Sequence, residues 1–264
     1  MEIFGYFAAL LVGVAMGLIG GGGSILTVPL LVYLFGLTPL LATSYSLFVV
    51  GSTSLVGALN SFRKGLVHLE AVALFGSSSL VTVFVSRRFL VPSIPEELFH
   101  VGSFTLTFSL LTMVLFAVLM LLASLSMIRG RKKDAAEEDS ARYSLKTLLG
   151  HGVGIGLITG LLGAGGGFLL IPALVLLLRL PMKMAVGTSL LIIALNSLIG
   201  FAGDLGHVAI EWSFLLRITA IAIAGIFFGG ALGKKIPGER LKKGFGWFVL
   251  LMGTYILIHE TIMK

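Results

Sequence analysis

The stretch Gly17-Leu-Ile-Gly-Gly-Gly-Gly-Ser-Ile-Leu-Thr-Val-Pro29 decides the fold of this chain, because it returns later as Gly160-Leu-Leu-Gly-Ala-Gly-Gly-Gly-Phe-Leu-Leu-Ile-Pro172. Each position of the second copy lies 143 residues after its counterpart, as the step from 17 to 160 shows. In both copies a run of glycines interrupts an apolar helix. Broken helices in corresponding positions of the two halves of a membrane protein point to the binding site of a transporter. The repeat therefore predicts a duplicated fold and the place of its site.

The composition is that of a membrane protein. Hydrophobic residues make up 57% of the chain, charged residues make up 12%, and the mean hydropathy is +1.07. A soluble domain usually carries about a quarter charged residues. Apolar segments near the ~20 residues needed to cross a bilayer recur from end to end. We therefore predict an all-α integral membrane protein with no separate soluble domain.

Several chemical classes are not supported by the sequence. The chain contains no Cys, and neither His nor carboxylates cluster at metal-ligand spacing, so we expect no metal site and no cofactor. No nucleophile, base and orienting group recur at usable spacing, so we expect no catalytic residues and no enzyme. The N-terminus lacks the basic region of a secretory signal, and we expect it to be mature structure.

Ten apolar segments follow one another along the chain. In the first half they are 3–19 and 25–36, which flank the glycines, and then 40–60, 69–90 and 98–128. In the second half they are 146–162, 168–179, 183–203, 211–233 and 241–260. We divide the chain into a first transmembrane repeat (1–128), a charged cytoplasmic linker (129–145) and a second transmembrane repeat (146–264).

The repeat extends past the glycines. Ala42-Thr-Ser-Tyr-Ser-Leu47 aligns at the same offset with Ala185-Val-Gly-Thr-Ser-Leu190, and Glu70 aligns with Glu211 after a slip of two residues. Chance similarity of apolar sequence does not produce an ordered series at nearly fixed spacing.

The distribution of Lys and Arg favours a hairpin for each glycine-interrupted pair of segments. If each pair crosses the membrane as one span, nine basic residues lie on each side. If each pair folds back with the glycines at its tip, fifteen lie on the linker side and four on the other. Because basic residues are enriched on the cytoplasmic side, the hairpins are preferred.

Hairpins followed by three crossings make the two repeats inverted, because three is an odd number. We therefore expect a multi-pass protein of the cell membrane with a cytoplasmic linker, both termini outside, and hairpins that enter from opposite faces. Segments of this length reach near or past the middle of the bilayer. The two glycine tips can meet there.

The tips are suited to an anion. We expect a helix to begin again at about Ser24 and at about Gly167, and the first N–H groups of a helix have no intrahelical partner. Together with the helix dipole, these N–H groups attract a small anionic substrate. No Lys or Arg lies near either tip in the sequence, so neutral donors complete the predicted site. The hydroxyl and amide side chains that follow the tips are Thr43, Ser44, Tyr45, Ser46, Thr188, Ser189, Asn196 and Ser197.

Each feature has a purely structural alternative. The glycine tips can be close packing, and membrane Ser and Thr often bond to their own helix. Three series of spaced glycines are interpreted as helix packing: Gly13 and Gly17; Gly152, Gly156 and Gly160; Gly225, Gly229 and Gly233. Ser103, Thr105, Thr107, Ser109 and Thr112 are interpreted as a polar stripe against neighbouring helices. Asp204, His207 and Glu211 are expected in solvent at the outer mouth, and Glu260 at a simple chain end.

The motif Gly163-Ala-Gly-Gly-Gly167, followed by Pro172 and Ala185-Val-Gly-Thr-Ser-Leu190, resembles the duplicated signature of the sulfite exporter TauE/SafE family of membrane permeases. The resemblance covers nearly the whole chain and implies transport of sulfite, sulfoacetate or related organosulfonates. It also implies these site residues: Gly20, Gly22, Gly23, Gly165, Gly166, Gly167, Gly187, Thr188 and Ser189. The first copy departs from the signature, with Ser24 in place of Gly167 and Ser44-Tyr45 in place of Gly187-Thr188.

The membrane potential favours export of an anion. An inside-negative potential drives an anion outward by ~2.3 kcal/mol per charge per 100 mV. We find no carboxylate in the middle of a predicted span that could couple uptake to protons or sodium. A coupled importer of small organic acids and a non-transporting membrane scaffold remain as alternatives. The expected partners are the small anion and the lipid bilayer, with a homo-oligomer left open and no nucleic acid.

Overall fold

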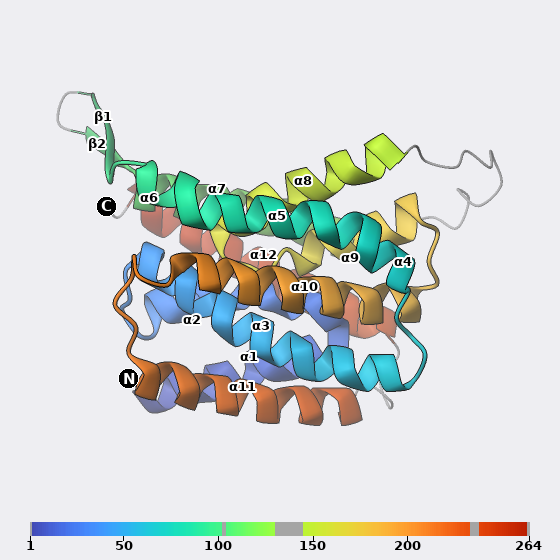
Figure 1. The fold of residues 1–264 in the computed structure, drawn as a ribbon. Helices are drawn as coiled ribbons and strands as arrows, with labels where there is room; N and C mark the ends of the chain where they lie inside the picture. Colours follow the sequence, from blue (N-terminus) through green and yellow to red (C-terminus); the bar gives the residue numbers. More distant parts are fainter. Residues whose placement is uncertain (1, 102–103, 130–144, 233–237, 263–264) are drawn as a thin grey trace.

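The fold is a bundle of long helices (Figure 1). It is taken from a computed structural model that describes residues 2–101, 104–129, 145–232 and 238–262. In the first half the chain forms α1 (Glu2–Ile19), the 3₁₀ helix η1 (Gly20–Leu26), α2 (Thr27–Tyr33), α3 (Pro39–Arg63), one continuous helix from 69 to 93, and α7 (Phe108–Arg129). In the second half it forms α8 (Leu145–Leu162), α9 (Gly167–Leu177), α10 (Met182–Asp204), α11 (Trp212–Leu232) and α12 (Gly238–Ile262).

The helix from 69 to 93 contains two wider turns. It consists of α4 (Leu69–Ala71), the π-helical turn η2 (Val72–Gly76), α5 (Ser77–Val85), the π-helical turn η3 (Ser86–Leu90) and α6 (Val91–Ser93). Such π-helical turns inside α-helices occur frequently at functional sites.

The membrane class predicted from the composition is confirmed. In the described ranges five helices are long and apolar enough to cross a membrane: α3, the helix from 69 to 93, α7, α10 and α11. The share of residues in the apolar stretch that is buried inside the protein is 61% for α3 and 67% for α10. It is 33–39% for the other three helices. Helices α3 and α10 therefore form the centre of the bundle.

The beginning of the predicted segment 98–128 is wrong. Strand β1 (Glu97–Val101) pairs antiparallel with β2 (Phe104–Thr107), and α7 begins only at Phe108. The alternation in Phe-Thr-Leu-Thr has the period of a strand, and β-branched and aromatic residues fit one well. An apolar run alone does not separate helix from strand.

The polar stripe expected in this region is also not formed as predicted. Thr105 and Thr107 lie in β2, and the Ser109 hydroxyl donates to the Glu96 carboxylate at 2.6 Å. The Thr112 hydroxyl donates to the carbonyl of Phe108 in its own helix at 2.8 Å. Ser103 lies outside the described residues.

The first glycine-interrupted pair turns back on itself. The side chain of Phe35, just after α2, packs against Gly5 near the start of α1, and its ring centroid is 5.5 Å from that of Tyr6. Helix α1 therefore begins beside the place where α2 ends. The chain reverses its direction between these two helices, within η1.

Figure 1 shows the second pair entering from the other end of the bundle. Helix α8 begins at the end opposite to the start of α1, and α9 runs back toward the end where α10 begins. Helix α12 ends at the same end of the bundle where α1 begins. Of the predicted linker 129–145, Arg129 ends α7 and Leu145 begins α8, and the residues between them lie outside the described ranges.

The helices of the two halves exchange partners. Helix α1 packs along α11 as α8 packs along α5, and α3 pairs with α10 as α7 pairs with α12. The spaced glycines make these contacts, as predicted: Gly13 meets the backbone of Ala222, Gly229 meets that of Val14, and Gly156 meets that of Ser79. Small residues at such positions let two helix backbones approach closely.

Candidate functional site

The two glycine tips meet in the interior. A Cβ atom placed on Gly21 would lie 2.9 Å from the Cα atom of Gly167, and one placed on Gly167 would lie 2.6 Å from the Cα atom of Gly21. The Ser24 hydroxyl links the same two segments, since its oxygen lies 2.6 Å from the carbonyl oxygen of Ala164 and 2.7 Å from that of Gly21. Ser24 is completely buried.

The second tip has an open helix N-terminus. Gly163, Gly165 and Gly166 all have positive φ angles, of 67°, 68° and 68°, which residues with a side chain rarely adopt. Helix α9 begins at Gly167, as predicted, and Leu169 and Leu170 both donate to the carbonyl of Gly166 at 3.0 Å. The N–H groups of Gly167 and Phe168, which precede these bonds, have no partner inside the helix.

The first tip is different, and the expected helix start at Ser24 is wrong. The segment Gly20–Leu26 winds as a 3₁₀ helix, and α2 begins only at Thr27, whose N–H bonds back to the Ser24 carbonyl. The 3₁₀ bonds use amides that an open helix end would have left free. Gly20 makes the turn with a φ angle of 74° against Val186, Gly22 lies within η1, and Gly23 packs against Met16 of α1.

Polar side chains surround the second tip. The Ser197 hydroxyl oxygen would lie 3.2 Å from a Cβ atom on Gly165, and the Thr159 hydroxyl would contact one on Gly166. Both hydroxyl oxygens are buried and have no hydrogen-bond partner in the described ranges. Asn196, one position before Ser197, donates from Nδ2 to the Ser79 hydroxyl at 2.6 Å, and its Oδ1 atom has no partner within the same ranges.

Two of the predicted site residues accept hydrogen bonds from the backbone just before helix starts. The Tyr45 hydroxyl accepts the backbone N–H of Glu211 at 2.6 Å, just before α11. The Thr188 hydroxyl accepts the backbone N–H of His68 at 2.9 Å, just before α4. Tyr45 and Thr188 are aligned positions of the repeat, so the two halves make the same kind of contact with different side chains.

The other predicted residues on α3 and α10 have mixed surroundings. Ser189 donates to the carbonyl of Val186 in its own helix at 2.9 Å, and Gly187 packs against the carbonyl of Leu66. Ser46 is buried, and its hydroxyl has no partner in the part of the chain that is described. Ser44 is also buried, and its hydroxyl likewise has no hydrogen-bond partner among the residues described.

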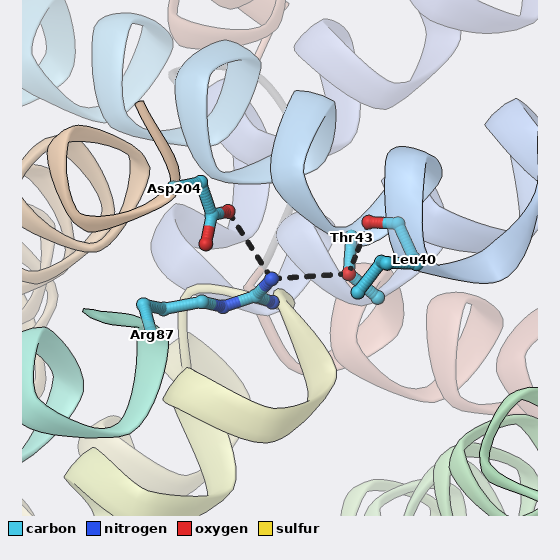
Figure 2. A network of polar contacts seen from close by, with 4 residues as sticks. All are labelled: Leu40, Thr43, Arg87 and Asp204. Atoms are coloured by element: carbon cyan, nitrogen blue, oxygen red, sulfur yellow. Dashed lines mark hydrogen bonds and ion pairs between the residues drawn. The ribbon is translucent and has the colours of Figure 1, made fainter. Parts of the chain in front are cut away.

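The charged centre of this region was missed by the sequence analysis. Figure 2 shows the guanidinium group of Arg87 between Asp204 and Thr43. The Nη1 atom of Arg87 is 3.2 Å from Oδ2 of Asp204 and 3.2 Å from Oγ1 of Thr43, which in turn donates to the carbonyl of Leu40 at 2.8 Å. The side chain of Arg87 is 1% exposed, and that of Asp204 is 5% exposed.

This pair corrects two expectations. Asp204 was expected in solvent at the outer mouth but is buried, whereas His207 and Glu211 are exposed as expected. The neutral site expected near the tips has a cation close by, because Thr43 bonds to Arg87 and also packs against Gly163 of the second tip.

Glu260 is a further correction, because it is not a simple chain end. It is 2% exposed, and its carboxylate accepts the Tyr33 hydroxyl at 2.9 Å.

Two more polar residues were missed although the repeat contains the signal for them. Thr53 and Ser54 lie 143 positions before Asn196 and Ser197. Both are completely buried, and their hydroxyls have no partner among the residues described. Applying the repeat offset to Asn196 identifies Thr53 directly. No such signal exists for Arg87, whose partner Asp204 lies 117 positions away.

No group of three His, Asp or Glu side chains in the described ranges is placed to hold a metal ion. The expectation that the protein works without a metal stays a prediction. The polar groups gathered here are an open helix end, neutral hydroxyls and one buried ion pair, which suit binding and not bond chemistry.

Related sequences carry the name probable membrane transporter protein. The family model described as sulfite exporter TauE/SafE matches residues 6–256. A probable membrane transporter protein of Xylella fastidiosa (strain 9a5c) is 29% identical over 252 residues, which is 94% of this chain and 91% of the relative. The probable membrane transporter protein YunE of Bacillus subtilis is 31% identical over 255 residues, which is 89% of this chain and 88% of the relative. None of the solved structures is a significant match. Both the duplicated glycine motif and these matches place the chain in one family: it belongs to the sulfite exporter TauE/SafE family of membrane transporters.

Proposed function

We propose that this membrane transporter exports small oxyanions, with sulfite, sulfoacetate and related organosulfonates as its substrates. The observation that carries the proposal is the contact between Gly21 and Gly167 at the open N-terminus of α9. The family description supports the same substrate class.

The proposed binding site centres on the second tip. The first amides of α9 supply N–H donors and the positive end of the helix dipole. The hydroxyls of Thr159 and Ser197, which have no hydrogen-bond partner among the described residues, supply neutral donors beside Gly165 and Gly166. A buried hydroxyl without a hydrogen-bond partner destabilises the fold, and a bound ligand that accepts its hydrogen bond would remove that cost. The first tip contributes its packing against Gly167 and the Ser24 link.

The transport cycle that we propose is alternating access around the two tips. We interpret the exchange of helix partners between the halves as an inverted repeat of 1–128 and 146–264. In such folds one repeat rocks against the other around a fixed site near the membrane middle. The linker between the repeats lies in the cytoplasm in this proposal, and both termini lie outside.

Export follows from the membrane potential, and a second candidate follows from Asp204. An inside-negative potential favours exit of an anion by ~2.3 kcal/mol per charge per 100 mV, so export needs no coupling ion. A carboxylate buried in the membrane can carry a proton, however. Because Asp204 is buried beside Arg87, a proton-coupled importer is the second candidate function.

Flux measurements with the purified protein separate the two candidates. We expect proteoliposomes loaded with radiolabelled sulfite to release it faster when the potential is negative inside, and to ignore a pH gradient at zero potential. Accumulation of sulfite driven by a pH gradient, without a response to the potential, would support the importer. Vesicles that show neither flux nor sulfite-dependent thermal stabilisation of the protein would contradict both.

A further inference from the structure

We propose that Arg87 is an anion-binding residue of the transport pathway and that Asp204 is its tethered counter-ion. The anion binds to the edge of the guanidinium group formed by Nε and Nη2. This inference rests on the proposed function and names a second binding station for the same substrates.

The bonding of the guanidinium group carries the proposal. Its Nη1 atom contacts both Asp204 and Thr43 at 3.2 Å. Its Nε and Nη2 atoms are buried and have no hydrogen-bond partner among the described residues. These two atoms carry parallel N–H groups, the arrangement that binds two oxygens of a carboxylate or another oxyanion at once. Because the side chain of Arg87 is only 1% exposed, water does not supply acceptors for these two N–H groups. A bound anion would supply them.

The position of Arg87 connects it to the glycine tip. Arg87 lies in the π-helical turn η3, and its neighbour Ser86 packs against Gly160 of α8. Thr43 bonds to Arg87 and packs against Gly163, where α8 ends. The chain thus places the guanidinium group one side chain away from the second tip. An anion that leaves the amides of α9 would meet a cation next, on the side of the bundle where α10 ends.

The fold itself does not require this ion pair. The repeat offset of 143 assigns Ser61 to the place of Asp204 and Val186 to the place of Thr43. Helix α11, which pairs with α1 as α5 pairs with α8, contains Arg217 as its only basic residue, and that side chain is exposed. Among its described residues, the other half therefore has no buried charged pair at the corresponding place. Apolar residues of similar size often stabilise a buried site as well as an ion pair does.

Asp204 explains how Arg87 can bind an anion without trapping it. The carboxylate neutralises the guanidinium group when no substrate is present, and it repels the substrate when one is bound. At separations of about 6–12 Å and an effective dielectric constant of about 20, this repulsion changes affinity by about tenfold to hundredfold. Asp204 is thus a positioning and tuning residue, whereas Arg87 touches the anion.

The test compares three variants of the full-length purified protein with the wild type. The first is the double variant Arg87→Gln/Asp204→Asn, which removes both charges and keeps a polar side chain at each position. The second is Asp204→Asn alone. The matched control is Arg88→Gln, which removes one positive charge from the adjacent, exposed position. The readouts are sulfite affinity from thermal shift, competition by acetate and chloride, and efflux of radiolabelled sulfite.

We expect the double variant to fold, to bind sulfite at least about tenfold more weakly, and to lose its preference for oxyanions over chloride, because chloride presents one acceptor atom to the two N–H groups and an oxyanion presents two matched oxygens. We expect Asp204→Asn to bind sulfite about tenfold more tightly or better, with a larger sulfite-dependent rise in melting temperature, and to release it more slowly. Arg88→Gln should match the wild type.

Three outcomes overturn the proposal in distinguishable ways. If the wild type neither binds nor transports sulfite, the proposed function fails and this inference fails with it. If the wild type transports and the double variant does so equally well, only the role of Arg87 is refuted. If the double variant does not insert into the membrane, the test rests on Asp204→Asn alone. Unchanged or weaker binding of sulfite by that variant would then refute anion binding at Arg87.

Discussion

The contact between the glycine tips makes Gly167→Ala a sharp perturbation. An alanine Cβ atom at position 167 would overlap the carbonyl oxygen of Gly21 and would lie 2.6 Å from its Cα atom. Ordinary carbon contacts begin near 3.5 Å, so the tips must separate by about 1 Å. That movement also stretches the bond between Ser24 and Ala164, which is 2.6 Å long.

The expected loss combines two effects. Inserting a methylene-sized group into a packed interior costs about 1–3 kcal/mol, and losing one internal hydrogen bond costs about 0.5–1.5 kcal/mol. We therefore expect Gly167→Ala to lower the free energy of unfolding by about 2–4 kcal/mol. We expect sulfite efflux to fall by about tenfold or more, because a shift of about 1 Å weakens the hydrogen bonds from the amides of α9.

Thermal unfolding in detergent and efflux from proteoliposomes measure these two losses. The matched control is Gly154→Ala in α8, where a Cβ atom would meet nothing within 4 Å. Alanine is favoured over glycine inside a helix, so this control should be neutral or slightly more stable. The reasoning is refuted if Gly167→Ala melts and transports like the control.

Three further predictions concern the Ser24 hydrogen bonds, the Tyr45 hydrogen bond and the orientation of the protein in the membrane. Ser24→Ala should lower stability by about 0.5–1.5 kcal/mol in thermal unfolding, and no change would mean that the tips are held together without the hydroxyl. Tyr45→Phe should cost a similar amount because it removes the acceptor for the N–H of Glu211, and a fully stable variant would exclude that bond as a support of α11. Because the chain contains no Cys, single cysteines report sidedness: a membrane-impermeant maleimide should label His207→Cys on intact cells and Lys64→Cys only after permeabilisation. The opposite pattern would reverse the proposed orientation.

Much of the fold could be predicted because membrane helices are defined by length and hydropathy. Segment 183–203 was expected, and α10 spans Met182–Asp204; segment 40–60 was expected, and α3 spans Pro39–Arg63. The hairpin of the first tip followed from the distribution of basic residues along the whole chain, and Gly5 does lie beside Phe35. The start of α9 at Gly167 followed from the end of the glycine run.

The failures occurred where local sequence has no single preference. Consecutive glycines accept many backbone conformations, so only the packing of Gly23 against Met16 and of Gly21 against Gly167 accounts for the 3₁₀ form of the first tip. The run before Phe108 was apolar enough for a helix, and the period of two within it was overlooked.

The charged part of the candidate site could not be predicted from local pattern. A basic residue near the end of a span is expected at the membrane surface, and so is an acidic residue just after a span. Arg87 and Asp204 are buried because the end of α10 packs against η3, a contact between segments 117 positions apart. Thr53 and Ser54, in contrast, could have been found by carrying Asn196 and Ser197 back by the repeat offset.

The binding of an anion between the glycine tips is tested most directly by an experimental structure of the protein saturated with sulfite. We expect density for the anion within about 3 Å of the first amide nitrogens of α9, between the Gly21–Gly167 contact and the guanidinium group of Arg87. Anion density remote from both glycine tips, or a map in which the tips do not touch, would contradict it.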